Sequence, residues 1–189
     1  MIFEYAILSF EPSLDELAKW ERDLRKRLGE NASGIMRVEA RRMEHHEFNA
    51  YCVLIKRGFN LTVKGVDGMA RKRGKSSPDV VLEGARWELK CPQGENARKT
   101  IRRNLTRALN QMRNADPPPS EIRIILSALE TSLPRGNVEY HVRRIMDEEV
   151  IDDMIVIYSE QDVRRYKRMS GDSHCPSCSD GGVSPLRAA

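Results

Sequence analysis

The sequence lacks any long apolar run, and this absence excludes a protein that spans a membrane by helices. No segment of the 189 residues approaches the roughly 18 consecutive apolar residues that a helix needs to cross a bilayer. The first residues also lack the basic region followed by an apolar stretch that marks a secretory leader. We therefore expect no membrane partner and a protein that is cytoplasmic at the point of synthesis.

Cysteine is scarce, and glycine-rich nucleotide motifs are missing. Four cysteines in a chain of this size do not indicate a disulfide framework. Cys175 and Cys178, with His174 just before them, could supply part of a zinc site, but a structural zinc needs four ligands, and a flexible tail explains the same pattern. No glycine-rich phosphate-binding motif is present, so ATP is not implied.

Acidic residues are missing from one long stretch of a chain that is 32% charged. Residues 96–115 contain six Lys or Arg and no acid, and residues 56–75 contain seven Lys or Arg and a single acid, Asp67. Clustered positive charge favours a polyanion such as nucleic acid, although a solvated basic surface is the alternative. The residues that we predict to contact nucleic acid are Lys75, Arg102, Arg103, Arg107 and Gln111.

Two short apolar runs between these basic stretches carry the most informative residues. The first run follows Asp79, the second contains Glu88 and Lys90, and Glu83-Gly84 between them is a turn signal. Because side chains alternate along a strand, Glu88 and Lys90 should share one face, while the apolar residues share the other. The pattern predicts a hairpin that brings two carboxylates and a lysine together at one end of a sheet.

This combination is suited to metal-dependent phosphodiester hydrolysis. Carboxylate oxygens are preferred ligands of Mg²⁺, which lowers the pKa of a bound water and stabilises charge on a phosphate. A neighbouring lysine adds positive charge or orients the nucleophile. Glu88-Leu89-Lys90 is the only Glu-x-Lys in the chain, but an acid followed by Glu-x-Lys also occurs by chance in highly charged sequences.

The remaining pattern predicts an α/β protein in which strands and helices alternate. We divide it into a strand–helix extension packed on the core (residues 1–40), a core (residues 41–169) and a flexible tail (residues 170–189). The helices are expected over residues 13–29, 44–57, 95–115, 137–150 and 161–169. The strands are expected over residues 1–10, 59–63, 78–82, 86–90, 122–126 and 154–158.

The order of these features resembles the PD-(D/E)xK nuclease superfamily, whose restriction-endonuclease-like fold is an αβββαβ core with a mixed sheet flanked by helices. More narrowly, residues 47–158 are similar to the C-terminal toxin domains of contact-dependent growth inhibition proteins of the CdiA type, many of which cut tRNA. The segments that carry the resemblance are Glu47-Phe48-Asn49-Ala50, Ser77-Pro78-Asp79, Trp87-Glu88-Leu89-Lys90 and, on the following helix, Gln111.

The resemblance implies a set of roles. Asp79 and Glu88 would be ligands of Mg²⁺ (or Mn²⁺), with the carbonyl of Leu89 as a third contact. Lys90 would be the catalytic lysine, and Glu47 a helix-borne acid that completes the site, with Glu44 one turn earlier as the alternative. RNA, tRNA especially, would be the substrate, and a toxin would have an immunity protein as partner. A DNA endonuclease of the resolvase or restriction type and a non-catalytic nucleic-acid-binding module are the alternatives.

Overall fold

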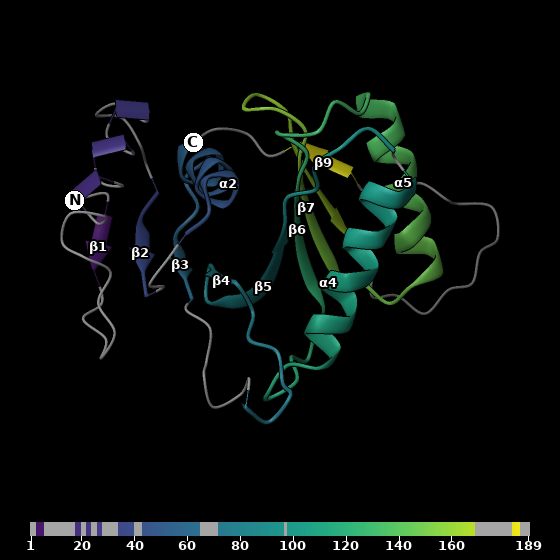
Figure 1. Ribbon diagram of the computed structural model, residues 1–189, viewed down its shortest axis with the longest axis horizontal. Helices are drawn as coiled ribbons and strands as arrows, with labels where there is room; N and C mark the ends of the chain where they lie inside the picture. The colour runs from purple at the N-terminus through teal and green to yellow at the C-terminus, as the bar shows by residue number, and fades with distance from the viewer. Residues whose placement is uncertain are drawn as a thin grey trace.

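The computed structural model of the chain describes residues 3–5, 18–19, 22–23, 26–27, 34–39, 43–64, 72–96, 98–168 and 183–185. Within this part of the chain, nine strands form one sheet, and their order in space follows their order in the sequence (Figure 1). The strands are β1 (Phe3–Tyr5), β2 (Met36–Val38), β3 (Leu61–Val63), β4 (Val80–Leu82), β5 (Ala85–Lys90), β6 (Arg123–Ser127), β7 (Asp153–Ile157), β8 (Val163–Lys167) and β9 (Val183–Pro185). The helices are α2 (His45–Lys56), the π-helical turn η1 (Arg98–Arg102), α4 (Arg103–Arg113) and α5 (Arg135–Glu148).

The sheet is mixed. Strands β1, β2 and β3 run parallel, β3, β4 and β5 are joined antiparallel, and β5, β6 and β7 run parallel again before β8 and β9 return antiparallel. Each parallel step from β5 to β7 needs a crossover, and α4 and α5 provide the two crossovers. The order α2–β3–β4–β5–α4–β6 is the expected αβββαβ order, so the predicted fold class is confirmed.

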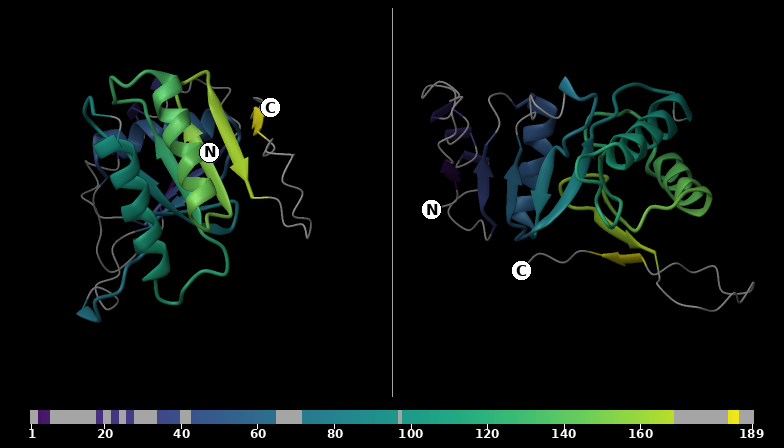
Figure 2. Two further views of the ribbon diagram at one scale, coloured as in Figure 1. Left: turned by 90° about the vertical axis from the view of Figure 1, so that its right-hand side faces the viewer. Right: turned by 90° about the horizontal axis from the view of Figure 1, so that it is seen from below.

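The helices cover both faces of the sheet (Figures 1 and 2). On β6, Ile125 packs into the core beneath α2, whereas Ile124 and Leu126 pack into the core beneath α4 and α5. All three side chains are fully buried, as expected for a central strand with helices on both faces. The two cores therefore meet back to back through the sheet, and α4 and α5 lie beside each other on one face (Figure 2).

The hairpin of β4 and β5 confirms the local prediction. Glu83 and Gly84 both have positive φ, 48° and 77°, which matches the tight turn whose twist suits two antiparallel strands. Trp87 and Leu89 are buried in the core beneath α2, so Glu88 and Lys90 point to the opposite face. The helix expected over residues 44–57 is also confirmed by α2, which Gly58 follows.

The prediction of a helix over residues 161–169 is wrong, because this segment contains the strand β8. Val163 and Tyr166 are both buried and three residues apart, a spacing that is compatible with a helix. In the structure, Val163 belongs to the core beneath α2 and Tyr166 to the core beneath α4 and α5, so they lie on opposite faces of a strand. The unpaired backbone groups along the edge of β7 decide the outcome, because β8 satisfies them.

Several expectations concern residues at the two ends of the chain. Of the first expected helix, residues 18–19, 22–23 and 26–27 are described and are helical, and the rest lies outside the described residues. Of the expected tail, only β9 is described, and it pairs with β8. His174, Cys175 and Cys178 lie outside the described residues, so the zinc alternative is untested. No helix in the described ranges is long and apolar enough to cross a membrane.

Candidate nuclease site

Asp79, Glu88 and Lys90 meet at the end of the hairpin. Val80 pairs with Trp87, so extending this register by one residue places Asp79 opposite Glu88. The Lys90 Nζ donates to Glu88 Oε1 at 2.5 Å and lies 3.7 Å from Asp79 Oδ2. Asp79 Oδ2 also accepts a hydrogen bond from the Leu89 backbone N–H at 3.1 Å. The hydrogen bonding between the two strands thus continues through the Asp79 side chain, and this bond fixes the Asp79 carboxylate beside β5.

Glu88 is the most unusual member of this cluster because it is a carboxylate with almost no contact with solvent. The residue is 1% exposed. Its Oε2 atom is buried and has no hydrogen-bond partner among the described residues. Burial, followed by the nearby charge of Asp79, raises the pKa of Glu88 to about 8, although Lys90 opposes the rise. A buried acceptor without a donor costs free energy, and a cation at Oε2 would remove that cost.

The donor set fits Mg²⁺ or Mn²⁺. Asp79 and Glu88 offer two carboxylates, and the Leu89 carbonyl oxygen lies beside them, 3.1 Å from the Lys90 Nζ. Hard divalent cations favour such oxygen ligands and usually retain several waters, so two carboxylates and one carbonyl suffice. Among the described residues, no group of three or more His, Cys, Asp or Glu side chains is close enough to hold a metal.

Glu47 lies near the cluster but has a local structural task. Its Oε2 accepts a hydrogen bond from the Glu44 backbone N–H at 3.0 Å, which caps the first turn of α2. Burial raises the pKa of Glu47, and the charge of Asp79 adds to the rise. Its assignment as an acid that completes the site stays a prediction.

Sequence reasoning missed a buried tyrosine beside these acids. Tyr51 on α2 is 1% exposed, and burial followed by the charge of Asp79 raises its pKa. It lies one turn after Glu47 on the same face of the helix. From the sequence, a tyrosine within an apolar helix is interpreted as a core residue, so only its tertiary neighbours place Tyr51 near the site.

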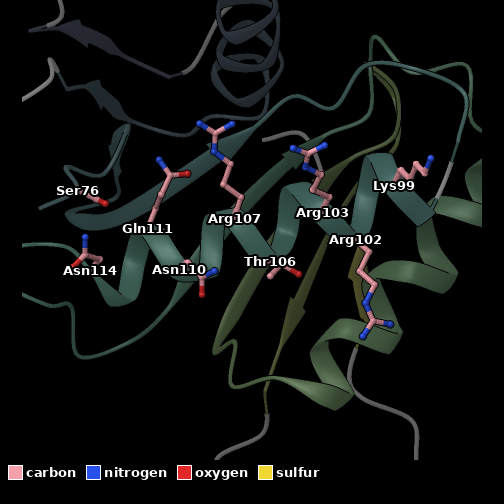
Figure 3. A pocket seen from close by; sticks show the side chains of 9 residues that line it. All are labelled: Ser76, Lys99, Arg102, Arg103, Thr106, Arg107, Asn110, Gln111 and Asn114. Atoms are coloured by element: carbon pink, nitrogen blue, oxygen red, sulfur yellow. The ribbon is translucent and has the colours of Figure 1, made fainter. Parts of the chain in front are cut away.

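A basic groove of about 880 Å³ runs along η1 and α4 (Figure 3), and α4 contacts β5, the strand that carries Glu88 and Lys90. Three of its cations, Lys99, Arg103 and Arg107, follow each other at intervals of four residues. Gln111 continues this row, and its Oε1 atom is buried without a hydrogen-bond partner among the described residues. The other lining residues are Ser76, Arg102, Thr106, Asn110 and Asn114.

The structure brings most, but not all, of the predicted nucleic-acid-binding residues into this groove. Arg103, Arg107 and Gln111 point from one side of α4, while Arg102 is turned away from them and donates to Glu148 on α5 at 2.5 Å (Figure 3). Lys75 is exposed but does not line the groove, whereas its neighbour Ser76 does.

No family model matches the sequence, and no curated protein matches it. Among solved structures, a CdiA-CT/CdiI toxin and immunity complex from Burkholderia pseudomallei is similar to 88% of this chain and 98% of that chain, with 14% identity and a TM-score of 0.44. This identity is too low to transfer the role of any residue. The chemistry of the site therefore rests on its own geometry.

Proposed function

We propose that the protein is a metal-dependent nuclease that hydrolyses phosphodiester bonds at the Asp79–Glu88–Lys90 cluster. The observation that carries this proposal is the convergence of two carboxylates on one lysine, with a buried Glu88 oxygen that has no hydrogen-bond partner in the described part of the chain. The basic groove on α4, the helix that contacts β5, supports a polyanionic substrate. RNA as the preferred substrate, a role as a toxin and an immunity partner rest on the sequence resemblance.

The residues of the cluster have two roles, which are to hold a cation and to bind a phosphate. Asp79, Glu88 and the Leu89 carbonyl would hold Mg²⁺ or Mn²⁺. The bound cation supplies Lewis acidity, which activates water and stabilises charge on the phosphate. Lys90 is 14% exposed, and its Nζ contacts Glu88 Oε1 and lies near Asp79, so it holds the two carboxylates in place. Its positive charge would also stabilise negative charge on a phosphate bound at the cluster.

Cleavage assays test this proposal directly. Purified protein is incubated with total RNA and with plasmid DNA, with Mg²⁺ or with EDTA, beside Asp79→Asn, Glu88→Gln and Lys90→Met. Glu95→Gln, at an exposed position in the loop after β5, is the matched control. We expect metal-dependent cleavage that the three site variants lose and the control retains.

Metal binding provides a second measurement that does not depend on activity. Calorimetric titration with Mn²⁺ should show a site in the wild type and in Lys90→Met that is lost in Glu88→Gln. Cleavage that survives Glu88→Gln would refute the site. Cleavage of plasmid alone would identify a DNA endonuclease, and nucleic-acid binding without cleavage of either substrate would identify a binding module.

A further inference from the structure

The cationic row on η1 and α4 has the spacing of a backbone-binding surface. Residues four apart in an α-helix advance by about 6 Å, which is comparable to the separation of successive phosphates along one nucleic-acid strand. Such a row also drifts around an α-helix, because four residues exceed one turn. The π-helical turn η1 takes more residues per turn and counters this drift, so Lys99 stays on the groove side with Arg103 and Arg107 (Figure 3).

A second row of neutral polar side chains lies beside the cations. Thr106, Asn110 and Asn114 follow each other at the same interval and line the same groove. Their hydroxyl and amide groups can donate to and accept from sugar and base edges. No aromatic residue is among those that line the groove, so its contacts favour the backbone over stacked bases.

One end of the groove is lined by Ser76, three residues before Asp79, and by Asn114 at the end of α4. The Ser76 backbone N–H donates to the Asn114 carbonyl at 3.2 Å, and Asn114 Nδ2 donates to the Gly74 carbonyl at 2.9 Å. These bonds fasten the segment before Asp79 to the end of α4. A strand lying along Lys99, Arg103 and Arg107 is therefore led towards the segment that carries Asp79.

The surroundings of α4 oppose entry into a double helix. A helix that reads duplex DNA must protrude so that it can enter the major groove. Here α5 lies beside α4, and Arg102 and Arg113 on that side are paired with Glu148 and Glu149 at 2.5 Å and 3.2 Å. The cations that remain for a ligand are Lys99, Arg103 and Arg107, which line the groove on η1 and α4 (Figure 3).

We infer that the groove binds a single-stranded polynucleotide, with consecutive phosphates against Lys99, Arg103 and Arg107 and with the strand running towards Asp79. This inference rests on the proposed function, since it names the form of substrate for the same site. The ligand chemistry is a single phosphodiester strand, which RNA and DNA share.

Binding is measured by fluorescence anisotropy in EDTA, with labelled 12-mers of one unstructured sequence as RNA, as DNA and as each duplex. A flat basic surface would bind the duplex more tightly because its charge density is higher. The groove predicts the reverse, with the single strand at least about tenfold tighter. Between 50 and 200 mM salt, three phosphate contacts alone weaken single-strand binding by about 20-fold.

Substitutions assign the salt dependence to the row. The slope of log K against log salt should fall by about 2 in the triple variant Lys99→Ala, Arg103→Ala and Arg107→Ala. A variant that keeps Lys99 and carries Arg103→Lys and Arg107→Lys retains the three charges, so its slope should equal that of the wild type. Arg113→Ala is the matched control, because Arg113 is on the same helix and exposed but outside the groove. Its slope should not change.

The outcomes separate this inference from the proposed function. Equal or tighter binding of the duplex, no measurable binding, or a slope that the triple variant leaves unchanged would overturn the single-strand inference, whatever the cleavage assays show. Single-strand binding through the row, without metal-dependent cleavage, would instead contradict only the nuclease proposal. The RNA and DNA arms identify which strand is preferred.

Discussion

Replacing Glu88 with glutamine should remove a specific pH dependence of stability from the metal-free protein. Burial and the charge of Asp79 raise the pKa of Glu88 from 4.5 to about 8. Between these values, the folded protein holds a proton on Glu88 that the unfolded chain releases. Stability from this group is therefore fully present below the unfolded value of 4.5 and is lost as the pH rises through the folded value of about 8.

The magnitude follows from the linkage between protonation and folding. Each pH unit within this window changes the free energy of unfolding by about 1.4 kcal/mol, so the whole window amounts to on the order of 5 kcal/mol. Glu88 is 1% exposed, so solvent screens this effect very little. Glutamine has the same shape and no titrating proton, so the variant should lack this contribution and gain stability over the wild type as the pH rises.

Urea denaturation in EDTA, from about pH 5 to about pH 8, measures the difference between the wild type and Glu88→Gln. The difference cancels the titration of the other groups, and Glu95→Gln controls for the loss of a carboxylate at an exposed position. Saturating Mg²⁺ should reduce the wild-type pH dependence, because a cation favours the ionised carboxylate. If both proteins lose stability in parallel across this range, the reasoning about the buried carboxylate is wrong.

Four substitutions test the packing by urea denaturation. Gly34→Ala should destabilise the protein by roughly 2–3 kcal/mol, because a Cβ there would lie 2.3 and 2.9 Å from two backbone carbonyl oxygens. Gly136→Ala should instead stabilise it by up to about 1 kcal/mol, because a Cβ there meets no atom within 4 Å. Equal changes in stability for the two variants would contradict this packing argument. Gly84→Ala should cost about 1 kcal/mol, because φ there is 77°, and an unchanged midpoint would exclude strain at the turn. Arg165→Ala should cost about 3 kcal/mol, because it leaves the buried carboxylate of Asp153, which is 5% exposed, without the guanidinium that donates to it at 2.9 Å. A cost below about 1 kcal/mol, the range of an exposed pair, would contradict this.

Local sequence rules were sufficient for the elements whose pattern has one interpretation. The hairpin of β4 and β5 follows from alternation and from Glu83-Gly84, and α2 follows from its apolar run and Gly58. The opposition of Asp79 and Glu88 is a consequence of that same hairpin register. The geometry of a tight turn fixes the register of the two strands that it joins, so this register depends little on the rest of the molecule.

The groove and the last strands could not be obtained in this way. The groove joins Ser76 to residues on η1 and α4 that are more than twenty positions later, and the sequence gives no indication that these segments meet. The strand β8 carries an apolar spacing that suits a helix, and only the edge of β7 selects the extended form. The orientation of Arg102 likewise depends on Glu148 of α5.

The sequence by itself determined which chemical groups the protein can use and that two carboxylates and a lysine stand at one end of a hairpin. Only the tertiary structure decided how deeply Glu88 is buried, which cations share the groove and which are neutralised by α5. The physical reason is range. Turn geometry and side-chain alternation act over a few residues, whereas burial, desolvation and ion pairing depend on segments that folding brings together from distant parts of the chain.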